Sequence, residues 1–274
     1  MISYPQIDPV IFSIGPFAPR WYGLVYLCGF LYLYYWMRRE SRWLGLKSQD
    51  QVDSVLGWLI LSMILGSRAT FVLVYNFEAY KESPWWEIFA VWHGGLSFHG
   101  GIFGVMLGSY FVARAYGIKL LRLWDMLMLS TPLAIGFGRI TNFINGELWG
   151  RPTDVPWAMV FPGAGPEPRH PSQLYQAVLE GFLFYVVVLI LWKKKARQGV
   201  IAGVFGIWYS VARSIGELFR EPDRQLGFFF GGLTMGQLLS FGFFFVGVTV
   251  FIYALRRPLD ENEERELALR GTSK

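Results

Sequence analysis

A cluster of polar side chains interrupts an apolar stretch near the middle of the chain, and these side chains are the ones best suited to chemistry. The cluster is Arg139, Asn142, Asn145 and Glu147, set between glycines and aromatic residues. An arginine at the centre of a membrane-spanning helix costs roughly 2.5–3.5 kcal/mol, so ionisable groups at this depth usually mark a functional site. The alternative is an interfacial loop in which the amides cap a helix end and Arg139 pairs with Glu147.

The composition of the chain is that of an integral membrane protein. Of its 274 residues, 53% are hydrophobic and only 16% are charged, whereas about a quarter of the residues of a soluble domain are charged. The net charge is +5, but the basic residues lie in short groups between apolar runs. This pattern indicates membrane topology and no nucleic-acid partner. Cys28 is the only cysteine, so an intrachain disulfide is excluded. It lies in an apolar run, and we therefore predict that it is a small core residue.

Long apolar runs predict the helices that must position the polar cluster. A run of about 17–25 residues crosses a hydrocarbon core of about 30 Å, and we predict an all-α integral membrane protein with a bundle of about seven transmembrane helices. They are Trp21–Met37, Val52–Tyr75, Leu96–Ala113, Leu120–Phe137, Leu174–Trp192, Val200–Arg213 and Leu233–Leu255, of which the sixth is the shortest. The first is predicted to stay as an anchor, because it lacks the basic n-region of a signal peptide.

The distribution of basic residues predicts the orientation of this bundle. Most of the 25 lysines and arginines follow the first, third, fifth and seventh apolar runs. Because cytoplasmic ends carry the excess of Lys and Arg, we expect an outside N-terminus and a cytoplasmic C-terminus. The proline-rich segment Asn142–Gln173 is then an extracytoplasmic loop region over the site. We expect one transmembrane catalytic domain over residues 1–257, and a short charged cytoplasmic tail over 258–274, a solvated helix without chemistry.

The stretch 136–150 resembles the signature of the prolipoprotein diacylglyceryl transferases. That signature runs Gly-Arg, a variable residue, a small residue, Asn-Phe, an apolar residue, Asn, a variable residue, Glu, two further positions and Gly. The matching residues are Gly138, Arg139, Asn142, Phe143, Ile144, Asn145, Glu147 and Gly150. Thr141 stands where the family usually has glycine or alanine, and this departure leaves every polar position intact.

Further stretches resemble other motifs of the same family. His99 lies in SFHGG, whose histidine is the family's favoured base, Tyr22 lies in RWYG, and Arg220 precedes Glu221-Pro222-Asp223. The resemblance implies a catalytic set and a substrate-binding set. The catalytic set is His99, Arg139 and Arg220, and the binding set is Tyr22, Arg139, Asn142, Glu147, Gly150 and Arg220. Without the resemblance, we would interpret His99 as a hydrogen-bonded side chain, the motif of Tyr22 as part of a membrane-interface aromatic belt, and the segment around Arg220 as a solvated loop with ion pairs.

The remaining polar residues leave alternatives open. The motif Arg169–Tyr175 also resembles the family. Gln176 follows it where most relatives are expected to have glutamate, so that position carries no charge in this chain. His93 is predicted to be interfacial. Arg68, in the second apolar run, is either a third arginine of the site or the partner of a carboxylate such as Glu180.

The resemblance implies a reaction that suits these residues. A guanidinium group binds phosphate through a fixed fork of donors, and the implied reaction moves the diacylglyceryl group of phosphatidylglycerol to the lipobox cysteine of a prolipoprotein signal peptide. No cofactor or metal is expected, because the histidines form no ligand spacing. We expect a monomer in the bacterial cytoplasmic (inner) membrane, with its site toward the outer leaflet. Alternatives are an anion or lipid-linked transporter, which should show paired repeats, and an intramembrane serine protease, which should show GxSxG.

Overall fold

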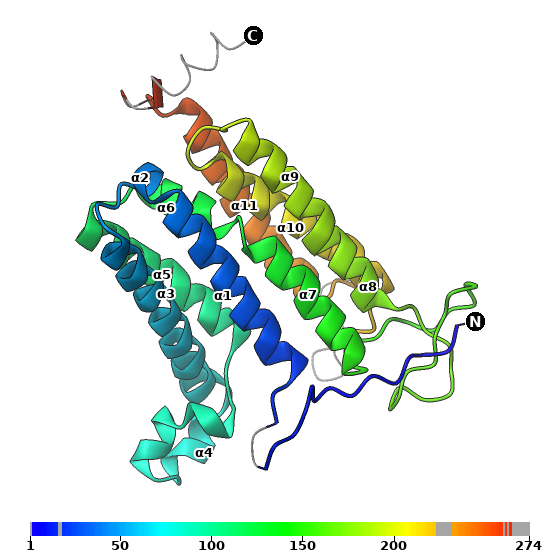
Figure 1. Ribbon diagram of the computed structural model, residues 1–274. Coiled ribbons are helices and arrows are strands. Elements are labelled where there is room, and N and C mark those ends of the chain that lie inside the picture. Colours follow the sequence, from blue (N-terminus) through cyan, green and yellow to red (C-terminus); the bar gives the residue numbers. More distant parts are fainter. Residues whose placement is uncertain (1, 16–17, 223–231, 260, 262, 265–274) are drawn as a thin grey trace. The chain divides into compact units, whose positions relative to one another are not determined.

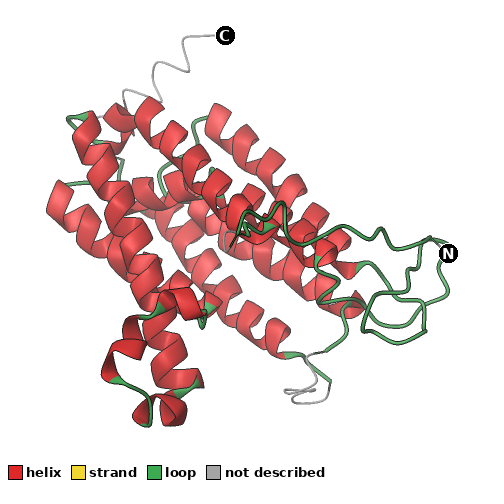
Figure 2. Cartoon of the chain, turned by 60° about the horizontal axis from the view of Figure 1, so that its bottom comes forward, coloured by secondary structure: helices red, strands yellow, loops and turns green. Residues whose placement is uncertain are grey.

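The computed structural model describes residues 2–15, 18–222, 232–259, 261 and 263–264. Within these ranges the regular secondary structure is helical, and β-pairing is limited to isolated bridges between loop segments (Figure 2). The chain divides into two compact units, Met1–Leu33 with Leu127–Lys274, and Tyr34–Met126. The all-α class is therefore confirmed.

The unit Tyr34–Met126 is built around two long helices that lie side by side, α3 (Gln49–Thr70) and α5 (Phe98–Tyr116) (Figure 1). A Cβ on Gly66 of α3 would stand 2.4 Å from the carbonyl oxygen of Gly100 and 2.6 Å from the Cα of Gly104. Helices in membranes associate through such small residues, because close backbones gain van der Waals contact. The glycines therefore set the register of α5 against α3.

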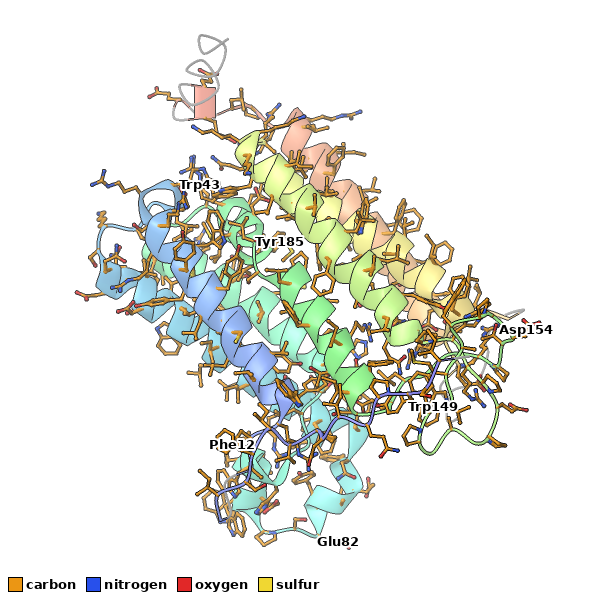
Figure 3. All side chains as sticks on the ribbon, turned by 45° about the vertical axis from the view of Figure 1, so that its right-hand side comes forward. Phe12, Trp43, Glu82, Trp149, Asp154 and Tyr185 are labelled. Atoms are coloured by element: carbon orange, nitrogen blue, oxygen red, sulfur yellow. The ribbon has the colours of Figure 1, made fainter. Side chains whose placement is uncertain are left out.

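Short elements complete this unit. A π-helical turn continues α3, and a short helix and two 3-10 turns lie between it and α5, near the labelled Glu82 in Figure 3. These are η1 (Phe71–Tyr75), α4 (Phe77–Lys81), η2 (Trp85–Phe89) and η3 (Val91–His93). Two further short helices lie outside this segment, α2 (Ser41–Leu44) before α3 and α6 (Leu120–Leu127) after α5. Helix α1 (Trp21–Arg39) begins in the first unit and ends in the second.

The other unit contains the helix of the signature stretch and a group of helices from the second half of the chain. They are α7 (Thr131–Ile144), α8 (Ser172–Gln176), the π-helical turn η4 (Ala177–Phe182), α9 (Leu183–Lys193), α10 (Val200–Phe219) and α11 (Met235–Arg256). Helices α9, α10 and α11 run side by side in Figure 1. A Cβ on Gly181 of η4 would stand 2.4 Å from the Cα of Gly136 in α7, so η4 and α7 touch through their backbones.

The predicted apolar runs are largely helical, but turn residues 128–130 divide the fourth run into α6 and α7, and not every run qualifies as a membrane span. Four helical stretches among the described residues are long and apolar enough to cross a membrane: Gln49–Tyr75, Leu120–Ile144, Ser172–Lys193 and Met235–Arg256. Helices α1, α5 and α10 contain 19, 19 and 20 residues. Their membrane crossing, and with it the number of seven, stays a prediction.

Several details of the sequence interpretation were wrong. Cys28 is exposed on α1 and is not a core residue, because an apolar side chain in a membrane helix can face lipid as well as protein. The signature helix continues to Ile144, so the loop begins later than Asn142, and α10 continues past Arg213 to Phe219. The predicted tail helix lies largely outside the described residues.

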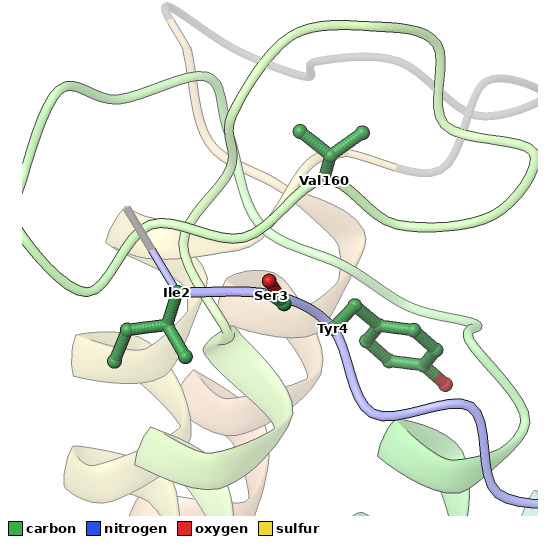
Figure 4. Close-up of a pocket in the computed structure, with 4 residues that line it drawn as sticks. All are labelled: Ile2, Ser3, Tyr4 and Val160. Carbon is green, nitrogen blue, oxygen red and sulfur yellow. The ribbon is translucent and has the colours of Figure 1, made fainter.

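An apolar cluster organises the long loop after α7. Phe143, Met159, Phe161 and Ala164 are buried together, and the ring of Tyr4 packs against them. Trp149 and Asp154, labelled in Figure 3, lie in this loop. A cavity of about 260 Å³ is lined by Ile2, Ser3, Tyr4 and Val160 (Figure 4). Its lining carries no charged side chain, so we do not place the site there.

Candidate functional site

The carboxylate of Glu147 is held by the amides of the signature stretch. Its Oε1 accepts hydrogen bonds from Asn142 Nδ2 at 2.8 Å and Asn145 Nδ2 at 3.0 Å. Asn142 Nδ2 also lies 3.5 Å from the hydroxyl oxygen of Tyr22, a contact at the limit of hydrogen-bond length. The fold therefore gathers Tyr22, Asn142 and Glu147 at the end of α7.

The N-terminal segment supports the same helix end. The Tyr4 hydroxyl donates to the carbonyl oxygens of Phe143 at 2.6 Å and Ile144 at 3.0 Å, two of the carbonyls that a helix leaves unpaired at its C-terminus. Burial raises the pKa of this hydroxyl above its ordinary value of 10.0. Tyr4 therefore remains a hydrogen-bond donor at neutral pH, and it caps α7 where the signature amides begin.

Arg139 forms an ion pair with Glu180, and not with Glu147 as one alternative supposed. Its Nε and Nη2 atoms lie 3.0 and 2.8 Å from Glu180 Oε2. The Glu180 side chain is fully buried, whereas 16% of the Arg139 side chain is exposed. Breaking a buried pair by removing one partner typically costs about 3–5 kcal/mol, because the other charge is left uncompensated. The pair therefore fixes the Arg139 guanidinium in a side chain that is mostly buried.

A chain of charged contacts continues from Glu180 along α10. Arg213 Nη1 lies 3.7 Å from Glu180 Oε1, and Arg213 Nη2 lies 2.5 Å from Glu217 Oε1. The same Glu217 oxygen lies 3.1 Å from Arg220 Nη1. The structure thus connects Arg139 to Arg220, the two arginines that the sequence singled out, through two buried glutamates and a third arginine. These arginines can present fork-shaped donors to an anion.

Gly150 is required by the close approach of two other segments. A Cβ at this position would stand 2.5 Å from the carbonyl oxygen of His170 and 2.6 Å from that of Phe219. Gly150 forms an isolated antiparallel bridge with Arg220, and the backbone N–H of Arg151 donates to the Phe219 carbonyl at 2.8 Å. The glycine therefore acts through backbone packing, which places Arg220 beside the end of the signature stretch.

The motif Arg169–Tyr175 fastens the same turn. Arg169 Nη1 donates to the carbonyl oxygen of Gly150 at 3.2 Å, and Gln173 Nε2 donates to that of Glu147 at 2.7 Å. Gln176, one turn further, is fully buried, and its amide forms no hydrogen bond with the described residues. The motif thus supports the signature backbone.

His99 is the second residue of α5, in the unit Tyr34–Met126. It is exposed, and its ring packs edge-on against Phe98 without a hydrogen bond to any described residue. The N-cap Ser97 accepts from the N–H of Gly100 at 3.2 Å. His93 is also exposed, and its Nδ1 lies 2.7 Å from the Glu87 carboxylate. Among the described residues, the alternative of a hydrogen-bonded His99 side chain finds no support.

Arg68, for which one alternative proposed Glu180 as the partner, has its contacts within its own unit. Its guanidinium donates to backbone carbonyl oxygens of its own unit, among them those of Ile88 and Glu87. Glu180 instead contacts Arg139 and Arg213.

Sequence reasoning missed Arg213, which the structure places between the two buried glutamates. One signal was present, because Arg213 and Glu217 are four residues apart on a helix, a spacing at which side chains meet. No group of three or more His, Cys, Asp or Glu side chains that could hold a metal occurs in the described part of the chain.

Comparison with known proteins agrees with the signature. A family model described as prolipoprotein diacylglyceryl transferase matches residues 9–253. The phosphatidylglycerol–prolipoprotein diacylglyceryl transferase of Geobacter sulfurreducens is 45% identical over 94% of this chain and 99% of its own. The proteins of that name from Methylocella silvestris and Rhodospirillum rubrum are each 46% identical over 94% of this chain, and over 97% and 96% of their own. The chain therefore belongs to the prolipoprotein diacylglyceryl transferase family.

Proposed function

We propose that this chain transfers the diacylglyceryl group of phosphatidylglycerol to the thiol of the lipobox cysteine in a prolipoprotein signal peptide. The sulfur forms a bond to the glyceryl carbon, the bond from that carbon to the phosphate oxygen breaks, and glycerol phosphate leaves. The thiol proton passes to a base. The observation that carries the proposal is the set of arginines joined through Glu180 and Glu217, next to the end of the family signature.

The arginines are suited to the leaving group. The phosphodiester of the substrate becomes a phosphate monoester and gains negative charge as the bond breaks. Donors held in place before the reaction stabilise this charge more in the transition state than in the ground state. Arg139 is held by Glu180 and remains 16% exposed, so we assign it to the phosphate, together with Arg220. Because Arg213 touches both glutamates, we add it to the sequence-derived set.

The remaining polar residues serve binding and alignment. Asn142 and Glu147 form a hydrogen-bonded pair next to Tyr22, and these groups suit the hydroxyls of a glycerol headgroup. Gly150 contributes through its backbone, as its contacts with His170 and Phe219 indicate.

His99 is our candidate for the base. A free thiol has a pKa of about 8.5, so only a few per cent is thiolate at neutral pH, and a positioned base contributes on the order of 10²–10⁴-fold to such a step. The imidazole is exposed and forms no hydrogen bond with described residues, so its nitrogen is available to accept the proton.

The proposed location and orientation of the chain rest on its basic residues. We propose that the chain lies in the bacterial cytoplasmic membrane with seven spans, its N-terminus outside, its C-terminus cytoplasmic and its site toward the outer leaflet. The distribution of lysine and arginine supports this orientation.

A reconstituted transfer assay tests the function. Purified protein is incubated with phosphatidylglycerol and a lipobox peptide, and the peptide mass is measured. We expect a gain of one diacylglyceryl group on the cysteine, and no gain with a peptide in which serine replaces that cysteine. An unmodified cysteine peptide would contradict the proposal.

A further inference from the structure

Four hydrogen bonds join the guanidinium group of Arg68 to backbone carbonyls of one loop, and the group also lies over the Tyr80 ring, 5.3 Å from its centroid. Its Nε donates to the carbonyl oxygen of Ile88 at 2.8 Å, and Nη2 donates to that of Glu87 at 2.6 Å. Nη1 donates to the carbonyl oxygens of Gly94 at 2.6 Å and Gly95 at 3.1 Å. The residue is only 4% exposed, so these bonds replace its contacts with water. Arg68 thus holds both ends of the segment Glu87–Gly95.

Arg68 performs this role without an acidic partner. No carboxylate of the described residues lies within ion-pair distance of it, and the carboxylate of Glu87 binds His93 instead. A planar guanidinium carries five N–H donors in a fixed fork, whereas a lysine ammonium is a compact point charge. The fork can therefore serve all four carbonyls, whereas an ammonium has only three donors.

The segment held by Arg68 leads directly into the helix that carries His99. Ser97, the N-cap of α5, donates its backbone N–H to the carbonyl oxygen of Ser67 at 3.1 Å, so the residue next to Arg68 holds the helix start. Gly95 has a φ of +75°, and a Cβ there would stand 2.5 Å from the Phe71 ring. The path from the loop to His99 is therefore tightly packed.

We propose that Arg68 is a positioning residue for His99. Its fork fixes the segment Glu87–Gly95, and with it the place where the first turn of α5 presents the imidazole. No hydrogen bond from a described residue orients the His99 ring, so the ring depends on the backbone for its position. The inference rests on the proposed role of His99 as the base, and it explains a buried arginine that the phosphate-binding set does not use.

The test compares Arg68→Lys with Arg122→Lys in the full-length protein, reconstituted in phosphatidylglycerol-containing nanodiscs. Arg122 is a matched control, because it is also buried in this unit and donates to a backbone carbonyl, that of Trp43. For Arg68→Lys we expect amide exchange in residues 87–97 to accelerate on the order of ten-fold. We expect kcat to fall on the order of ten-fold or more, with KM for phosphatidylglycerol changed less than about two-fold. Arg122→Lys should change neither.

A double mutant separates positioning from general damage. If Arg68 acts through His99, adding Arg68→Lys to His99→Gln should lower the transfer rate little beyond His99→Gln alone. Losses that multiply, or a wild-type kcat in Arg68→Lys with a loosened loop, would overturn the inference.

A second variant covers the case in which Arg68→Lys does not fold. Gly95→Ala leaves the arginine in place but pushes a methyl group toward Phe71 and toward Arg68 Nη1, which would stand 2.9 Å away. The same pattern of lower kcat and nearly constant KM is expected, and a wild-type kcat despite a displaced loop would refute the positioning role. Failure of the proposed function would be seen separately, as a wild-type protein that transfers no lipid. Amide exchange tests the contact between Arg68 and the loop and requires no transfer activity.

Discussion

Replacing Arg139 with lysine keeps the positive charge and removes the fork, so it isolates what the guanidinium geometry contributes. In the structure two nitrogens of Arg139 lie 3.0 and 2.8 Å from one oxygen of Glu180. A lysine ammonium cannot reproduce that pair of contacts while it also donates two parallel bonds to a phosphate. A hydrogen bond to a charged group contributes about 1.5–3 kcal/mol. Losing one such bond in the transition state lowers the rate about 10–150-fold.

The assay for Arg139→Lys is the initial rate of peptide lipidation at several concentrations of phosphatidylglycerol. We expect kcat/KM to fall by that factor, with most of the loss in kcat, because the bonds to the leaving phosphate strengthen as its charge develops. Arg38→Lys is the control, since Arg38 is an exposed residue whose Nε contacts Gln49. Wild-type kcat/KM in Arg139→Lys would refute bidentate phosphate binding by this residue.

Further predictions address topology, the base and the backbone. A reporter fused after Trp192 should score as cytoplasmic and one inserted near Gly163 as extracytoplasmic, and both reporters on one side would contradict the proposed orientation. His99→Gln should keep phospholipid binding and regain part of its transfer rate as pH rises toward the thiol pKa of about 8.5. Arg220→Ala should show no such recovery of rate with pH. Equal pH profiles of the two variants would show that His99 is not the base. Gly150→Ala should abolish transfer or lower the melting temperature, since its Cβ would stand 2.5 Å from a backbone oxygen; wild-type values of both would show that the close packing is not needed.

The sequence predicts the helices because lipid imposes a simple requirement on them. The long apolar runs are largely helical, as expected when the backbone must satisfy its own hydrogen bonds, although turn residues 128–130 divide one run between α6 and α7. Helix ends are less predictable, since polar residues can continue a helix when the surrounding protein satisfies them. Asn142 and Glu217 both lie in helices for this reason, at positions where the apolar pattern had already stopped.

The sequence by itself also determined the family, because the types and spacing of Arg139, Asn142, Glu147 and Gly150 form a signature that needs no structure to be read. It could not determine which side chains share a contact. The partner of Arg139 is 41 residues away in the chain, on a separate helical segment, and Arg213 carries no motif at all.

Only the tertiary structure decided the partners of the buried charges. Both Arg68 and Arg139 lie in apolar helices, yet one is bound by loop carbonyls and the other by Glu180. The physical reason is that a buried cation binds whichever acceptors the packed backbone brings within about 3 Å of it. Sequence spacing specifies which face of a helix a residue occupies, and helix packing decides what that face meets.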